Sequence, residues 1–180
     1  MKRTAFILIL LALFAMALAA SAQVVPSAKG SRPSLSAGGL AMAAQPNYAG
    51  GFNAEASPYY LFGVGGFVDY RMSRWVQLEA EGRWQRWNQY NGINESTYAL
   101  GLREPIHTFG RVTPYGKAMI GFGTGSFLDS RAALYALGGG ADYRLNKRFS
   151  LRADFEYQRW RVAPVLHPYA AGIGIVYRIF

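Results

Sequence analysis

The sequence predicts an all-β protein, an eight-stranded antiparallel up-and-down transmembrane β-barrel. Three observations support this. Apolar and polar residues alternate with a period of two along eight segments, as they do in strands with two unlike faces. The segments are about ten or more residues long, which is the length that a tilted strand needs to cross a membrane. Short and long connections alternate between them, as the turns and loops of a membrane barrel do.

The N-terminal residues 1–22 are predicted to be a cleaved signal peptide. Two basic residues precede an apolar run from Ala5 to Ala20, and a small-residue cleavage motif ends at Ala22. Residues 23–34 carry Pro, Ser and Gly without periodicity, so we expect a flexible periplasmic arm there. Residues 35–180 are expected to form the barrel domain.

The eight predicted strands follow in order along the barrel domain. They cover residues 36–45, 59–72, 75–87, 94–104, 111–123, 132–145, 149–160 and 167–180. From the second strand onwards each contributes to one apolar face: Tyr60, Phe62, Val64 and Val68; then Val76, Leu78 and Ala80; then Leu100 and Leu102; then Ala118, Ile120 and Phe122; then Leu137; then Phe155; and last Ile173 and Ile175. An even number of antiparallel strands allows the barrel to close without a free edge.

The opposite face of these strands carries charges of both signs. Six acidic and six basic residues lie on it: Asp69, Arg71, Glu79, Glu81, Arg83, Arg103, Lys117, Asp142, Arg144, Arg152, Asp154 and Glu156. A Lys or Arg facing lipid at mid-bilayer would cost about 2–4 kcal/mol, so we expect these residues to form a paired charge network in the lumen. The alternative is a soluble β-protein whose polar face meets water.

Aromatic residues gather near the ends of the predicted strands, as they do at the two interfaces of a membrane barrel. One group flanks the tight turns at 72–74 and 145–148 and the C-terminus: Tyr70, Trp75, Tyr143, Phe149 and Tyr177. The other flanks the longer loops: Tyr60, Trp84, Trp87, Tyr98, Tyr135, Tyr157, Trp160 and Tyr169. The connection at 104–111 is longer than the other turns on its side.

The net charge of +9 is high for an exported chain, and without Lys2 and Arg3 it is still +7. Such a charge favours nucleic acid, anionic lipid or lipopolysaccharide as a partner, and export makes nucleic acid an unsuitable one. Four arginines cluster near the predicted loops, where guanidinium groups could bind lipopolysaccharide phosphates: Arg86, Arg131, Arg159 and Arg161. The alternative is that they are ordinary solvated charges.

The C-terminal segment "YAAGIGIVYRIF" is similar to the last strand of bacterial outer-membrane proteins. With the hairpins "FVDYRMSRWVQLEAEGRW" and "GGADYRLNKRFSLRADFEY", it makes residues 35–180 resemble the OmpA-like or OmpX-like family of small outer-membrane β-barrels. The resemblance implies the cell outer membrane as the location and an assembly signal, read by the barrel-assembly machinery, in Ile173, Ile175, Tyr177 and Phe180. Two-domain members add a peptidoglycan-binding domain after the barrel, and we expect none here.

The expected role is structural or interactive, with the loops at the cell surface and the lumen closed by its charges. A small pore or transport barrel is the first alternative, and a lipid-modifying barrel enzyme is the second. An enzyme would need a nucleophile and a base, for which Ser126 or Ser130, with Asp129 and His167, are the candidates. The chain has no Cys and only two distant His, so we predict no catalytic residue, metal site or cofactor.

Overall fold

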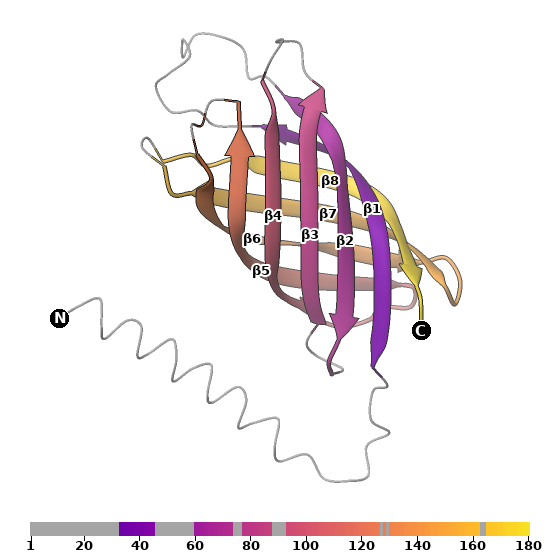
Figure 1. Cartoon of the computed structure of the whole chain (residues 1–180). Coiled ribbons are helices and arrows are strands. Elements are labelled where there is room, and N and C mark those ends of the chain that lie inside the picture. Colours follow the sequence, from indigo (N-terminus) through magenta and orange to yellow (C-terminus); the bar gives the residue numbers. More distant parts are fainter. Residues whose placement is uncertain are drawn as a thin grey trace, which may run out of the picture. The chain divides into compact units, whose positions relative to one another are not determined.

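The computed structural model describes residues 33–45, 60–73, 77–87, 93–126, 128, 130–162 and 165–180. These residues form one closed antiparallel barrel in which β8 pairs with β1 (Figure 1). The strands are β1 (Ser34–Gln45), β2 (Leu61–Arg71), β3 (Gln77–Trp87), β4 (Glu95–Pro105), β5 (Val112–Gly125), β6 (Ala132–Arg144), β7 (Phe149–Trp160) and β8 (Tyr169–Arg178). Within the described residues, no helix is long and apolar enough to cross a membrane.

The predicted eight-stranded antiparallel barrel is confirmed, and the strand bounds differ from the prediction by at most two residues. The first strand begins at Ser34, which the sequence had assigned to the N-terminal arm. Its backbone already pairs there with Arg71 of β2, so the ladder extends to the strand end. The predicted signal peptide and residues 23–32 of the arm lie outside the described residues.

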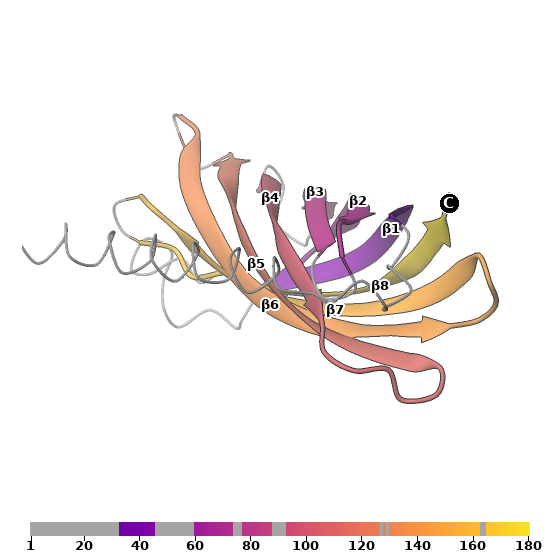
Figure 2. The same ribbon diagram turned by 90° about the horizontal axis from the view of Figure 1, so that it is seen from below.

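Closure leaves no strand with an unpaired edge. Gly39 of β1 lies opposite Gly66 of β2 on one side and Ile175 of β8 on the other. Figure 2 shows the strands curving round so that β1 lies beside β8. Since a bilayer offers no water to backbone groups, this mutual pairing is what allows a sheet to span it.

The two ends of the barrel differ in their connections, and we call them the turn end and the loop end. At the turn end β1 begins, β8 ends, and connections 72–76, 106–111 and 145–148 join strand pairs (Figure 1). The last of these is held by Asn146, whose Oδ1 accepts hydrogen bonds from the amides of Arg148 (2.8 Å) and Phe149 (2.9 Å). The loop end carries connections 46–60, 88–94, 126–131 and 161–168.

Side chains alternate between the lumen and the outer surface on every strand. In β7, for example, Arg152, Asp154 and Glu156 are buried, whereas Leu151 and Phe155 are exposed. The apolar outer face includes Phe62, Val64, Val68, Leu100, Leu102, Ile120, Leu137, Ile173 and Ile175, all of them exposed in the isolated chain. The exposed apolar surface and buried charges are the reverse of a soluble protein, which fits a barrel with lipid outside.

The lumen also holds a small apolar core near the loop end. It consists of Met119, Ala132, Leu134, Ala136, Trp160 and Leu166, contributed by β5, β6, β7 and the connection before β8. A second apolar group, Leu40, Phe67 and Val176, packs where β1, β2 and β8 adjoin. The charged part of the lumen therefore has an apolar layer above it at the loop end.

Candidate functional site

The candidate site is a network of buried ion pairs in the lumen. Of the twelve charged residues that the sequence placed there, nine are buried: Asp69, Glu79, Glu81, Arg83, Arg103, Lys117, Arg152, Asp154 and Glu156. Arg71 and Asp142 are half-buried near the turn end. Arg144 is exposed and donates to the carbonyl of Gly110 (3.4 Å), so it takes no part in the network.

Lys117 lies at the centre of the network. Its ammonium group lies 3.0 Å from carboxylate oxygens of Glu81, Asp154 and Glu156, and 3.3 Å from Glu79. Lys117 projects from β5, whereas these carboxylates come from β3 and β7. One ammonium group therefore links strands that are far apart in the sequence.

Two arginines extend the network along the lumen. Arg83 donates to Glu81, and to Asp154 (3.0 Å) and Glu156 (2.9 Å). Arg152 donates to Asp69 (2.7 Å), Glu79 (3.0 Å) and Asp142 (2.9 Å). Each guanidinium contacts carboxylates on more than one strand, so the pairs connect opposite walls of the barrel.

The fourth cation, Arg103, lies closer to the turn end. It contacts Asp142 (2.5 Å) and Gln77, and its guanidinium lies 3.7 Å from the centre of the Tyr115 ring. Tyr115 in turn donates to Asp154 (2.6 Å). The alternation in the sequence already places Gln77 and Tyr115 on the charged face, but as uncharged residues they are not part of the predicted network.

Between the described residues of the lumen network, the ion pairs thus join six carboxylates to four cationic side chains. The predicted network contained six acidic and six basic residues. Two of the basic residues, Arg71 and Arg144, lie towards the turn end in the structure. The central lumen therefore has an excess of negative charge and the turn end an excess of positive charge.

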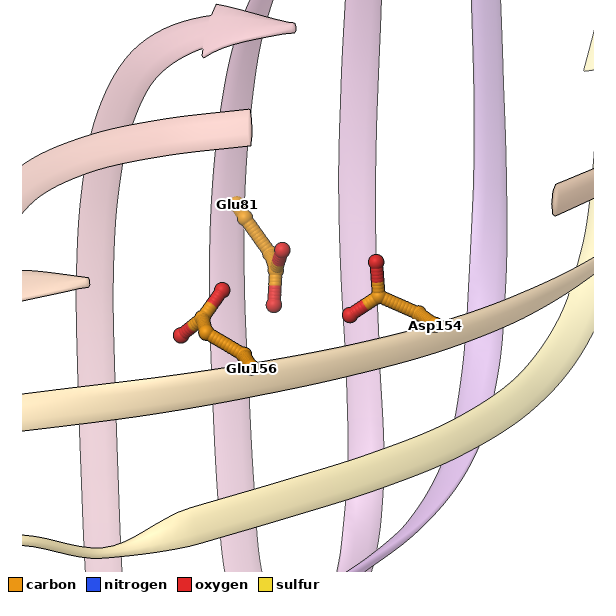
Figure 3. Close-up of side chains that lie close together, drawn as sticks. All are labelled: Glu81, Asp154 and Glu156. Atoms are coloured by element: carbon orange, nitrogen blue, oxygen red, sulfur yellow. The ribbon is translucent and has the colours of Figure 1, made fainter. Parts of the chain in front are cut away.

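Three carboxylates come close enough together to resemble a metal site. Oxygens of Glu81, Asp154 and Glu156 lie within 4.8 Å of one another, and Figure 3 shows the groups converging. Because Lys117 and Arg83 contact all three, protein cations already occupy the centre of this acidic cluster. The sequence could not show the cluster, since Glu81 and Glu156 are brought together only when the barrel closes.

Trp160 was predicted to belong to the aromatic belt at the loop end, and this was wrong. Its side chain is 0% exposed and packs inside the lumen with the apolar core. Its Nε1 donates to Gln158 (2.8 Å), and Gln158 donates to Glu156 (2.7 Å). Trp160 therefore closes the loop end of the lumen and is connected through Gln158 to the ion pairs.

Other predicted belt residues do lie on the outer surface. Tyr98 accepts a hydrogen bond from Trp84 (2.9 Å), and its ring is tilted against that of Phe122, with ring centres 5.3 Å apart. Near the turn end the rings of Phe149 and Tyr177 are 5.1 Å apart. Trp75 lies outside the described residues.

The four arginines proposed to meet lipopolysaccharide are all exposed at or beside the loop end. The guanidinium of Arg131 lies 5.1 Å from the centre of the Phe122 ring, which holds it against the outer wall. Arg86 is the last residue but one of β3, and Arg159 and Arg161 flank the end of β7. The structure thus places Arg131, Arg159 and Arg161 near the adjacent strands β6 and β7, and Arg86 on β3, which β4 and β5 separate from β6.

His167, the candidate base of a barrel enzyme, contacts a tyrosine instead of a serine. Its Nδ1 lies 2.5 Å from the hydroxyl of Tyr157, and the two rings are stacked. Ser126 accepts a hydrogen bond from the amide of Asn94 (3.1 Å), and Asp129 lies outside the described residues. Among the described residues, the structure therefore brings no serine hydroxyl to His167.

In the proposed assembly signal, Ile173, Ile175 and Tyr177 lie on the outer face of β8 and are exposed. The strand ends at Arg178, so Phe180 lies beyond it, 62% exposed, and its carbonyl accepts a hydrogen bond from Leu35 of β1 (3.2 Å). The terminal aromatic residue therefore does not continue the row of the other three.

Comparison with known proteins gives one family and several solved structures. Residues 8–178 match the family described as outer membrane protein beta-barrel domain. Neisserial surface protein A is 15% identical, with 82% of this chain and 97% of that chain covered and a TM-score of 0.58. No curated protein sequence matches significantly.

Two further structures are alike in fold. Ail, the attachment invasion locus protein of Yersinia pestis, in complex with the heparin analogue sucrose octasulfate, is 15% identical over 81% of this chain and 99% of that chain, with a TM-score of 0.57. The N-terminal β-barrel domain of Pseudomonas aeruginosa OprF is 18% identical over 84% and 100%, with a TM-score of 0.54. At these identities the likeness shows the fold alone.

Proposed function

Because this chain belongs to the outer membrane protein β-barrel domain family, we propose that it is an integral outer-membrane barrel with a structural and interactive role at the cell surface. The observation that carries this proposal is the filled lumen. Cross-lumen ion pairs centred on Lys117 occupy its middle, and the apolar layer around Trp160 lies above them. Side chains fill the volume that a solute would need, so the lumen acts as a brace between the walls.

The orientation follows from the asymmetry of the connections. Outer-membrane barrels have short periplasmic turns and longer extracellular loops, so the turn end faces the periplasm on this proposal. The chain reaches the periplasm with residues 1–22 as a cleaved signal peptide and residues 23–33 as a linking arm before β1. The barrel-assembly machinery then reads the outward row of β8, Ile173, Ile175 and Tyr177, with Phe180 beside it.

The first experiment is to purify the outer-membrane fraction and run it unboiled and boiled on a detergent gel. A closed transmembrane barrel resists unfolding by the detergent, so we expect the protein in this fraction and a shift in migration on boiling. Planar-bilayer recording of the same material should give no stable single-channel conductance. A periplasmic protein without the shift would contradict the membrane barrel, and a steady conductance would favour the pore alternative.

The loop end is proposed to contact lipopolysaccharide through Arg86, Arg131, Arg159 and Arg161. The solved complex of Ail with a polysulfated ligand supports the idea that a barrel of this fold can meet a polyanion. Guanidinium groups pair bidentately with phosphate, and Arg131 is held beside the aromatic wall by Phe122.

Replacing all four of these arginines with glutamine is expected to lower lipopolysaccharide co-purification several-fold and to raise detergent sensitivity, because four phosphate-binding groups are lost at once. The barrel itself should stay folded, since all four side chains are exposed at or beside the loop end. The matched control is Arg111→Gln with Arg144→Gln, which removes charge at the turn end. Unchanged lipopolysaccharide content in the quadruple variant would contradict the contact.

A further inference from the structure

The turn end of the lumen contains a small polar pocket with an excess of positive charge. The pocket has a volume of about 40 Å³. Six basic side chains line it: Arg71, Arg103, Lys147, Arg148, Arg152 and Arg178. Only two acidic side chains, Asp69 and Asp142, face them there.

Both of these carboxylates are already engaged. Arg152 contacts Asp69 (2.7 Å) and Asp142 (2.9 Å), and Arg103 contacts Asp142 (2.5 Å). Among the described residues, no ion pair joins Arg71, Arg148 or Arg178 to a carboxylate. The positive charge at this end is therefore not balanced by the described part of the chain.

Arg71 is the most informative member of the group. It is half-buried, and its Nε is shielded from solvent without a hydrogen-bond partner in the structure. β1 lies between β2 and β8. Arg71 of β2 and Arg178 of β8 pair with Ser34 and Ser36 of β1, so both arginines lie at the turn end. The charges of Arg178 and Arg103 repel that of Arg71, and Asp142 and Asp69 attract it less strongly. A buried donor among like charges is an arrangement that an anion would stabilise.

We propose that this pocket binds a phosphate group, with Arg71 and Arg178 as its principal ligands. Guanidinium groups donate paired hydrogen bonds to phosphate oxygens, and the hydroxyls of Ser36 and Ser150 line the same pocket. At roughly 10–15 Å³ for each water molecule, the pocket has room for about three water molecules. This volume suits one tetrahedral oxyanion and excludes a sugar or an acyl chain. The phosphate is either free or the headgroup of an anionic phospholipid in the adjacent leaflet.

The test begins with the full barrel folded in zwitterionic detergent and titrated with inorganic phosphate, followed by calorimetry and phosphorus NMR. Arg71→Gln with Arg178→Gln is expected to weaken binding about tenfold or more, since it removes two charged donors. The matched control, Arg111→Gln with Arg144→Gln, removes the same charge at the same end from residues that do not line the pocket, and it should leave binding within about twofold. An equal loss in both pairs would overturn the proposal.

A second arm identifies the source of the phosphate. The barrel is placed in nanodiscs of phosphatidylcholine with and without phosphatidylglycerol, and retained lipid is measured by native mass spectrometry. Retention of phosphatidylglycerol that depends on Arg71 and Arg178 assigns the site to a headgroup. Binding of inorganic phosphate without such retention assigns it to the free ion. Absence of both in the wild-type barrel would overturn the site.

Folding is checked by the boiled and unboiled gel for every variant. If the double variant fails to fold, Arg178→Gln alone serves, because Arg178 is the exposed last residue of β8 and forms no ion pair with the described residues. We expect it to weaken phosphate binding about threefold or more, while Arg144→Gln leaves it unchanged. Wild-type affinity in Arg178→Gln would remove that residue from the site and overturn the proposal as stated.

Discussion

Replacing Lys117 with methionine is expected to destabilise the barrel by about 3–5 kcal/mol. Methionine keeps the unbranched shape of the lysine side chain and removes its charge. The ammonium group lies within 3.3 Å of oxygens from Glu79, Glu81, Asp154 and Glu156, all buried. Its loss leaves four carboxylates close together, and among the described residues only Arg83, Arg103 and Arg152 still pair with them.

The measurement is denaturant unfolding of the barrel in lipid vesicles, with the folded fraction read from the unboiled gel. Lys147→Met is the matched control, because Lys147 is exposed in the turn between β6 and β7 and forms no ion pair with the described residues. We expect the control to stay within about 0.5 kcal/mol of the wild type. Equal stability of the Lys117 and Lys147 variants would show that the lumen pairs do not hold the barrel.

A second substitution separates charge from packing in this result. Adding Glu81→Gln to Lys117→Met removes one of the four carboxylates that Lys117 contacts, so less negative charge is left uncompensated and we expect part of the lost stability to return. The coupling between the two positions in a double-mutant cycle should be about 1–3 kcal/mol, since the groups are in contact. Additive losses would mean that Lys117 acts through its aliphatic stem alone.

The strands were predictable because one physical rule governs the whole barrel. Lipid outside and side chains inside impose a period of two, so Leu151 and Phe155 had to face one way and Arg152 and Asp154 the other. Strand ends were less certain, by up to two residues, because the backbone ladder continues past the last clearly alternating side chain. Ser34 shows this, since it pairs with Arg71 although the sequence around it reads as a linker.

The sequence predicted which charged residues face the lumen, but it could not predict which of them form ion pairs with one another. Alternation gives the face of a strand, but the height at which two strands meet across the lumen depends on their tilt and stagger. For this reason the contact between Arg83 and Glu156, 73 positions apart, could not be derived from the sequence. The exposure of Arg144 could not be derived from the sequence either. The alternation places this residue on the inner face of β6, but the end of the strand is open to solvent.

Trp160 could have been placed correctly by parity alone. It lies two residues after Gln158 and four after Glu156, so it shares their face and must enter the lumen. Its position at a strand end, next to the exposed Arg159, suggested an aromatic belt instead. An aromatic residue at a strand end can thus lie in the outer belt or in the lumen. It lies in the lumen when an even number of positions separates it from the nearest inward-facing charged residue.

Replacing Trp160 with alanine is expected to destabilise the barrel by about 3–5 kcal/mol. The indole is fully buried against Met119 and Leu134, and its loss also removes the hydrogen bond to Gln158. Trp87→Ala is the matched control, because Trp87 ends β3 on the outside and is 60% exposed. Unfolding in vesicles should separate the two variants, whereas equal losses would mean that tryptophans stabilise this barrel only through the membrane interface.

Gly123 of β5 supplies the sharpest test of the Trp160 packing. A Cβ atom at this position would lie 2.4 Å from the Trp160 ring, closer than real Cβ contacts allow, so the ring fits only because position 123 has no side chain. Gly123→Ala should therefore cost about 1–3 kcal/mol in the wild-type barrel. In the Trp160→Ala background the same methyl group enters the vacated space, and we expect it to be neutral or stabilising. An equal cost of Gly123→Ala in both backgrounds would mean that the glycine is needed by the backbone of β5 and that Trp160 does not occupy the lumen beside it.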